Sequence, residues 1–397
     1  MTATASGPAR SEPGLIALLS LGAFGSAASM RVLDAQLPAL ARDFELSLAG
    51  VAQAITVFSV AYGVLQLAYG PIGDRFGKWR VIASAVFASG LTSALCAAAP
   101  SFGVLLIARA LAGATCAAII PLSMAWVGDA VAYERRQPVL ARFLTGQILG
   151  MALGQWLGGV ASDYANWRVP FAVLALCFFA AGALLWRARG AAAQTAPVVP
   201  RSGHPWHEAR YVVRQRWARV VLATVFIEGT VLFGALAFLA THLHLRYGVS
   251  LTHAGSIATF YAVGGLLFAI ASRRLVARLG EAGLARGGGV LLLVGLFAVT
   301  LSPVWWTAPA ACALAGLGFY MLHNTLQTNA TQMAPDARGA AVSMFASAFF
   351  LGQTAGVALA SLAVASVGTL PVISSAAVAV FALALAFGAM RARRVAR

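Results

Sequence analysis

The sequence predicts an all-α membrane protein in which twelve transmembrane helices form two pseudo-symmetric six-helix bundles. Of the 397 residues, 60% are hydrophobic and only 10% are charged, whereas about a quarter of the residues in soluble domains are charged. The apolar residues form runs long enough to cross a hydrocarbon core of about 30 Å. A long polar stretch near the middle of the chain separates one set of runs from the other.

The apolar runs fall into two sets of six. The first set covers 13–36, 48–70, 79–99, 103–127, 138–161 and 168–187, and the second covers 217–241, 253–273, 285–303, 306–329, 338–363 and 369–390. The stretch between the sets begins with small residues and prolines, as flexible linkers do, and its part from Trp206 to Trp217 predicts a basic helix at the membrane surface. We therefore expect an N-terminal bundle at 1–187, a cytoplasmic linker at 188–216 and a C-terminal bundle at 217–397.

The distribution of basic residues predicts the orientation of the chain. The formal net charge is +16, and Lys and Arg gather in the gaps after the even-numbered spans and at the C-terminus, whereas the gaps after spans 3, 9 and 11 hold none. Cytoplasmic loops carry this excess of positive charge, so both termini are expected in the cytoplasm. Arginines placed in short gaps between spans favour contact with anionic lipid over binding of nucleic acid.

The sequence lacks the motifs of several other protein classes. The four cysteines lie far apart inside apolar runs, so we expect no metal site and no cofactor. No zinc-protease helix motif, nucleophile elbow or phosphate-binding glycine loop is present, which argues against an enzyme or an ATP-driven pump. A sensor or scaffold with the same architecture stays open, although its soluble segments are too short for an output domain.

A charged loop, "GPIGDRFGKWR", joins the second and third spans. It resembles the signature loop of the major facilitator superfamily, Gly-x-x-x-Asp-Arg-x-Gly-Arg/Lys-x-Arg/Lys. The residues that match are Gly70, Asp74, Arg75, Gly77, Lys78 and Arg80. Together with Gly73, the glycines permit a tight connection. A weaker copy, "RRLVARLGEAGLARG", follows the eighth span, with Ala277 in place of the acid.

The resemblance implies that the loop takes part in gating at the cytoplasmic side. By resemblance, Asp74 contacts the other half near Arg338, at the positive N-terminus of the eleventh span. Asp129 and Arg135, in the gap after the fourth span, resemble the acid and the arginine that the family pairs with this loop. An equally good explanation for these charges is that they serve membrane topology alone, because arginine in this gap keeps it in the cytoplasm.

Two further motifs resemble features of that family. "RALAG", from Arg109 to Gly113, is similar to Arg-x-x-Gln-Gly, with Ala112 in place of the Gln. "GQILGMALGQWLGG" is similar to the glycine-rich motif of the drug/proton antiporter branch, with Gln155 at the usual proline. A spacing of four places the glycines of the second motif on one helix face, where they allow close helix packing. These glycines are Gly146, Gly150, Gly154 and Gly158, and Gly159 completes the motif.

Ionisable side chains inside the apolar runs are the candidates for coupling and for substrate binding, because such groups are costly in hydrocarbon. Arg31 and Asp34 share a face of the first span, and Arg109 lies at a similar depth in the fourth, so we expect Asp34 and Arg109 to interact directly or through Arg31. Glu228, near the middle of the seventh span, could carry a proton or hold a cationic substrate.

The tenth span adds a polar face, on which His323 and Gln327 stand four residues apart and could line a cavity. For all of these groups, a purely structural role between helices is the alternative.

These observations predict a secondary transporter in a bacterial inner membrane. The expected activity is proton-coupled efflux of small amphipathic organic compounds by alternating access. Export of sugars or other metabolites, and uptake by symport, are the alternatives. The expected partners are a small-molecule substrate, protons and the lipid bilayer, and we expect the chain to act as a monomer.

Overall fold

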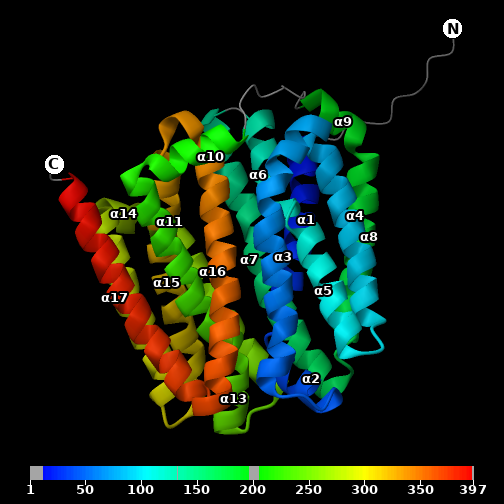
Figure 1. Cartoon of the computed structure of the whole chain (residues 1–397), viewed down its shortest axis with the longest axis vertical. Helices are drawn as coiled ribbons and strands as arrows, with labels where there is room; N and C mark the ends of the chain where they lie inside the picture. The colour runs from blue at the N-terminus through cyan, green and yellow to red at the C-terminus, as the bar shows by residue number, and fades with distance from the viewer. Residues whose placement is uncertain (1–11, 132, 196–204, 396–397) are drawn as a thin grey trace.

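The computed structural model describes residues 12–131, 133–195 and 205–395, and these residues form helices and no strand. The long helices run side by side along the longest axis of the molecule (Figure 1). The beginning of α1 (Glu12–Arg31) and the end of α17 (Thr369–Val395) lie at the same end, together with α9 (Arg189–Thr195) and α10 (Pro205–Arg214). We call this the termini end, and the opposite end, which carries α2 (Leu37–Asp43), the far end.

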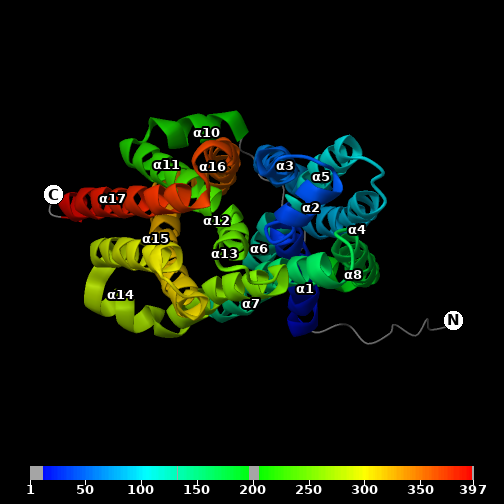
Figure 2. The same ribbon diagram turned by 90° about the horizontal axis from the view of Figure 1, so that it is seen from below.

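The N-terminal half contains six spans. The first consists of α1 and α2, and the fourth consists of α5 and α6. The remaining four are single helices. The bounds are α3 Leu48–Phe76, α4 Lys78–Ala97, α5 Phe102–Cys116, α6 Ile119–Ala130, α7 Tyr133–Tyr164 and α8 Val169–Arg187. Seen from the far end, this half forms one group of helices and the C-terminal half forms another (Figure 2).

The C-terminal half also contains six spans. Its first span is divided into α11, the π-helix η1, α12 and α13, and α14 comprises two spans. The bounds are α11 Arg216–Glu228, η1 Gly229–Phe233, α12 Gly234–Ala237, α13 Leu239–Tyr247, α14 Leu251–Leu301, α15 Ala308–Gln332 and α16 Arg338–Val367, and α17 is the last span. Two short 3₁₀ turns, η2 Trp305–Thr307 and η3 Pro335–Ala337, precede α15 and α16.

Hydropathy alone recovers ten of these spans, in nine described helical segments. Within the described residues, nine helical segments are long and apolar enough to cross a membrane, with α14 counted once. The helices α7 and α15 also have the required length, at 32 and 25 residues, but polar side chains such as Gln147 and His323 lower their mean hydropathy. With these two helices, and with α14 counted as two spans, the described chain has the twelve transmembrane helices that the sequence predicted.

The charged connection at 70–80 is helical rather than a loop, which corrects the sequence-based expectation. Helix α3 continues through Pro71 to Phe76, Gly77 alone leaves the helix with φ of 89°, and α4 begins at Lys78. The gap expected between 273 and 285 is likewise reduced to Gly280, with φ of 61°. Glycine makes both turns possible because it adopts positive φ without steric cost.

The first span, predicted as one helix, is interrupted between Arg31 and Leu37 by a turn. Pro38 lies in the first turn of α2. Its ring nitrogen cannot donate to the carbonyl of Asp34, and its ring would clash with that carbonyl in a continuous helix. The interruption therefore follows from the proline, and it places Asp34 in non-helical backbone in the interior of the protein.

The two halves contact each other through α3 with α16 and through α7 with α14. The ring centroids of Tyr62 and Phe350 lie 4.3 Å apart near the middle of the first pair. At the far end of the second pair, Asp163 accepts hydrogen bonds from the backbone N–H groups of Leu251 and Thr252. Ala35 of the N-terminal half is buried in the apolar core of the other half. These contacts join the halves at mid-height and at the far end.

Candidate functional site

A pocket lies between the two halves near the middle of the spans. It contains about 490 Å³ of empty space, with open solvent included, and its walls come from α1, α7, the divided seventh span, α14 and α15. The polar and aromatic side chains in its lining are Arg31, Gln155, Thr259, Phe233, Tyr261, Phe319 and Tyr320. Both halves contribute, so a ligand bound here would contact both.

The break in the first span places an ion pair at this pocket. Arg31 is the last residue of α1, and its Nη1 lies 2.9 Å from Oδ2 of Asp34. The Asp34 side chain is fully buried, and about 10% of the Arg31 side chain is exposed. The guanidinium carbon of Arg31 lies 5.0 Å from the ring centroid of Phe233 in the other half. Arg31 therefore joins the buried acid to the wall of the pocket.

Arg109 lies deeper in the N-terminal half than the sequence suggested. It is fully buried and donates hydrogen bonds to the carbonyls of Ser29, at 3.0 Å, and Ala54, at 3.3 Å. Its guanidinium carbon lies 4.2 Å from the ring centroid of Phe58. Among the described ion pairs, Asp34 pairs with Arg31 and not with Arg109. Arg109 therefore connects the first, second and fourth spans, and it can act on Asp34 only at longer range.

Glu228 pairs with a histidine from another helix. It is the last residue of α11, immediately before the π-helix, and its Oε2 lies 2.8 Å from Nδ1 of His323 on α15. Glu228 is fully buried, and 16% of the His323 side chain is exposed. The imidazole is enclosed by aromatic rings, with the centroids of Phe319 and Phe349 at 5.0 Å and 4.6 Å. The pair can share a proton inside an aromatic enclosure.

Gln327 is not part of this pair. No hydrogen bond of its side chain is described, and neither Gln327 nor His323 belongs to the pocket lining. The expected polar face of the tenth span is thus divided, because His323 turns toward Glu228 while Phe319 and Tyr320, one turn earlier, reach the pocket.

The charged connection forms a clamp within its own half. Lys78 Nζ lies 3.1 Å from Oδ1 of Asp74 and 2.6 Å from Oδ2 of Asp129. The backbone of Gly73 packs against Leu122 on α6. Together these contacts tie the termini ends of the second, third and fourth spans to one another.

Other predicted members of the gate loop make fewer contacts. Gly70 has open space beside it and Arg80 is exposed, while the guanidinium of Arg75 lies near the ring of Phe76. The side chains of Arg135 and Arg338 lie outside the described residues. Among the described residues, Asp74 pairs with Lys78 of its own half and not with a group of the other half.

The glycines of α7, the fifth span, face the first span at close range. A Cβ atom built at Gly146 or Gly154 would lie 2.8 Å or 2.5 Å from the carbonyl oxygen of Ser20 or Ala28. Equivalent positions at Gly150 and Gly158 meet the carbonyls of Phe24 and Val32. Four glycines thus oppose four carbonyls at matching intervals.

Two more glycines of the predicted set also lie against backbone. Gly113 faces Phe58 on α3, and Gly159 faces Leu251 of the other half. Gly159 therefore stands at the contact between the halves, whereas Gly113 stands inside the N-terminal bundle.

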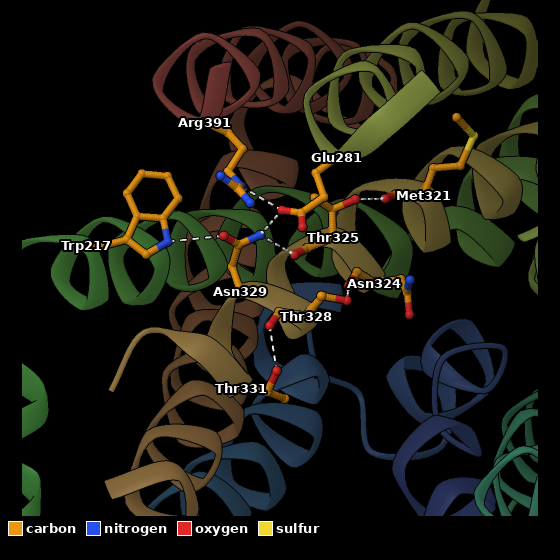
Figure 3. A network of polar contacts seen from close by, with 9 residues as sticks. All are labelled: Trp217, Glu281, Met321, Asn324, Thr325, Thr328, Asn329, Thr331 and Arg391. Atoms are coloured by element: carbon orange, nitrogen blue, oxygen red, sulfur yellow. Dashed lines mark hydrogen bonds and ion pairs between the residues drawn. The ribbon is translucent and has the colours of Figure 1, made fainter. Parts of the chain in front are cut away.

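A second polar clamp, which sequence reasoning missed, closes the termini end of the C-terminal half (Figure 3). Glu281 Oε2 accepts hydrogen bonds from Nε of Arg391, at 2.6 Å, and from Nδ2 of Asn329, at 2.8 Å. Asn329 Oδ1 accepts from Nε1 of Trp217 at 3.1 Å. These residues join α11, α14, α15 and α17.

The repeat in the sequence contained a signal for this second clamp. Gly77 and Gly280 align, so Lys78 and Glu281 occupy the same position, each directly after a glycine with positive φ. The first clamp uses a central cation between acids, and the second uses a central acid. The alignment of Asp74 with Ala277 hides the similarity of the two clamps, because the central residue is a cation, Lys78, in one half and an acid, Glu281, in the other.

The linker is attached to the C-terminal half. Helix α10 forms where a surface helix was expected but ends at Arg214, because Gln215 has extended backbone and α11 begins at Arg216. The Tyr211 hydroxyl donates a hydrogen bond to Oδ2 of Asp336 at 2.7 Å, and this bond raises the pKa of Tyr211 above its usual value.

Comparison with known proteins agrees with the fold. The chain is 24% identical over 340 residues to an uncharacterized MFS-type transporter, YceJ, of Bacillus subtilis (strain 168), a match that covers 83% of this chain and 84% of YceJ. The inner membrane transport protein YnfM of Escherichia coli (strain K12) is 25% identical over 259 residues, which is 64% of this chain and 58% of YnfM. The puromycin resistance protein pur8 of Streptomyces alboniger is 34% identical over 153 residues, or 36% of this chain and 30% of pur8.

Solved structures give the same result for the fold. A nucleoside transporter, NupG, superposes with a TM-score of 0.73 at 14% identity, over 95% of this chain and 99% of NupG. A bacterial homolog of the human lysosomal transporter Spinster, in an inward-facing and occupied conformation, also gives 0.73, at 17% identity over 98% of each chain. The sequence model of the Major Facilitator Superfamily matches residues 19–357. The chain therefore belongs to the major facilitator superfamily and is a transporter rather than an enzyme.

Proposed function

We propose that this transporter couples an inward flow of protons to the export of small amphipathic organic compounds. The observation that carries the proposal is the buried Glu228–His323 pair beside a pocket shared by both halves. An ionisable group inside the membrane is costly, and it is retained where it serves transport. Glu228 is the acid of this pair, and it lies where the helix changes from α to π, which often marks a functional position.

Alternating access supplies the mechanism in this proposal. The contacts between the halves named above lie at mid-height and at the far end. If the termini end is cytoplasmic, as the basic residues predict, these contacts favour a state that is closed toward the outer side of the membrane. Rocking of the halves about the pocket would then open the far end and close the termini end.

Export is favoured over the alternatives by one relative. The puromycin resistance protein is similar to 36% of this chain, and resistance to a compound is consistent with its removal from the cell. Metabolite export and uptake by symport remain the competing functions. A bacterial inner membrane location, cytoplasmic termini and a monomeric state belong to the same proposal.

Replacement of Glu228 by glutamine tests the proton coupling. A panel of amphipathic compounds, puromycin included, first identifies a transported compound in efflux-deficient cells, and flux of that compound is then measured in proteoliposomes. We expect Glu228→Gln to reduce flux driven by a pH gradient at least tenfold and to retain exchange without a gradient, because the amide keeps the size of the side chain but cannot carry the proton.

Glu281→Gln is the matched control for this experiment. It makes the same chemical change in the same half but in the clamp rather than beside the pocket, and it should leave the dependence of flux on the pH gradient intact. If Glu228→Gln transports with unchanged coupling, Glu228 does not carry the proton. Flux of the wild-type protein that ignores the pH gradient would refute proton coupling altogether.

Asp74→Asn tests the clamp of the N-terminal half. The Asp74–Lys78 pair is partly exposed, with 23% and 18% of the side chains accessible, so its loss should change the free energy of unfolding by less than about 1 kcal/mol. We expect turnover to fall several-fold, with substrate binding within about twofold of wild type, because the clamp biases the two states of the transporter. Asp336→Asn is the control, since Asp336 contacts Tyr211 of the linker. Normal turnover of Asp74→Asn would limit the loop to a role in topology.

A further inference from the structure

The pocket presents hydrogen-bond donors that no described protein group uses. Arg31 pairs with Asp34 through Nη1 alone, and no described hydrogen bond engages its other N–H groups. The Tyr261 hydroxyl is buried, and no partner for it is found in the described residues. Gln155, only 7% exposed, also has no described hydrogen bond. A buried donor without a partner is unfavourable, so a ligand with acceptor atoms is the natural complement.

The lining holds a cation and no acid. Arg31 is the charged residue of the described pocket wall. Asp34 and Glu228, the two buried acids of the described residues, do not belong to the lining, and each already faces a basic side chain, Arg31 or His323. Arg109 is also buried in the N-terminal half, at longer range from Asp34, so the buried charges described there are two guanidinium groups and one carboxylate. The potential at the pocket therefore favours an anion.

Aromatic rings supply the remaining wall. Phe233 and Phe319 approach edge to face with centroids 5.5 Å apart, and Tyr261 and Tyr320 lie 5.7 Å and 5.1 Å from Phe319. A wall of this kind accommodates a flat apolar body. A mostly apolar lining with a few polar groups is typical of sites for small organic ligands.

We propose that the pocket binds small amphipathic organic anions, with the carboxylate or a similar acidic group on Arg31 and the apolar body between Phe233, Phe319, Tyr261 and Tyr320. The guanidinium donates to the anion with the N–H groups that Asp34 leaves free. Tyr261 and Gln155 complete the donor set. This inference rests on the proposed transport function and narrows its substrate class from amphipathic compounds in general to anions.

The test measures equilibrium binding to the purified full-length protein in nanodiscs, without any gradient. Three probes share one aromatic body and differ in charge: 1-naphthoate, 1-naphthamide and 1-naphthylmethylammonium. We expect 1-naphthoate to bind at least tenfold more tightly than the amide and the ammonium compound to bind most weakly. Preference for the ammonium compound would overturn the proposal, as would the absence of 1-naphthoate binding by folded protein.

Two arginine variants locate the effect. Arg31→Gln should weaken 1-naphthoate at least tenfold and leave 1-naphthamide within about twofold, so that amide binding reports an intact pocket. Arg246→Gln removes an equal charge from an exposed position at the far end and should change neither affinity. If both variants lose the same factor in affinity for 1-naphthoate, Arg31 acts only through the net charge of the protein and does not bind the anion directly. If Arg31→Gln loses both probes, Arg31→Lys decides, because it keeps the charge and should keep the preference for the anion.

Lipid composition distinguishes a soluble anion from an anionic lipid headgroup. The measurement is repeated in nanodiscs of phosphatidylcholine alone and in nanodiscs that contain phosphatidylglycerol. Equal naphthoate affinities support a soluble ligand, and displacement by phosphatidylglycerol would overturn that assignment. Because no proton gradient is present, a failure here refutes the ligand class, whereas a failure of the Glu228 experiment refutes the coupling.

Discussion

Replacing Asp34 by asparagine should destabilise the protein by about 3–5 kcal/mol, because it leaves a buried cation without its counter-charge. Asp34 is fully buried, and the adjoining Arg31 is about 90% buried with its Nη1 2.9 Å from the carboxylate. The second buried guanidinium, that of Arg109, would then lie in the same half with no acid near it. The measurement is the thermal unfolding midpoint of the purified variant in detergent, which should fall well below that of the wild type.

A double-mutant cycle separates the pair from its surroundings. The variant Arg31→Gln/Asp34→Asn should recover part of the stability that Asp34→Asn loses, because neither charge is then left alone. Asp43→Asn is the control: Asp43 is 49% exposed and lies 3.8 Å from Arg168, so its loss should cost less than about 1 kcal/mol. Strictly additive effects of the two single substitutions would show that Arg31 and Asp34 are not coupled.

Gly150→Ala should also lower stability markedly, by about 1–3 kcal/mol, as expected for overpacking of a tight contact. The new Cβ would meet the carbonyl oxygen of Phe24, an atom of the α1 backbone that cannot turn aside as a side chain can. Helices α1 and α7 would have to separate, and the neighbouring contacts of Gly146 and Gly154 would be lost as well. The same thermal measurement in detergent detects the loss.

Gly103→Ala is the matched control for this substitution. Gly103 is also a helical glycine, in the first turn of α5, but nothing lies within 4 Å of the position a Cβ would take. Alanine is a better helix former than glycine, so this variant should be as stable as the wild type or slightly more stable. If Gly150→Ala unfolds at the same temperature as Gly103→Ala, the close approach of α1 and α7 does not limit stability.

The spans could be predicted from the sequence because hydropathy and loop charge are local properties. The six-and-six arrangement needed only the apolar runs and the polar stretch between them. The breaks inside spans were harder to predict: the turn before Pro38 carries a local signal, but the single-residue turns at Gly77 and Gly280 depend on how the flanking helices pack.

Pairings between distant residues could not be predicted from composition or period. Glu228 and His323 are 95 positions apart, and Asn329 reaches Glu281 over 48. The sequence indicated that Glu228 and Arg31 lie in costly surroundings, but only the arrangement of helices shows that one faces an imidazole and the other a pocket. The spacing of His323 and Gln327 predicted a shared face, yet the two side chains do not act together.

The π-helix of the seventh span determines which side chains line the pocket. Gly229 and Gly234 both pack against the backbone of α16, although they are five residues apart. In a regular α-helix, five residues turn through about 500°, which would leave the second glycine about 140° from the first. The wider turn over Gly229–Phe233 reduces this difference. The extra residue in the π-helix therefore sets the direction about the helix axis of the side chains that follow it, and Phe233 and Leu236 line the pocket as a result.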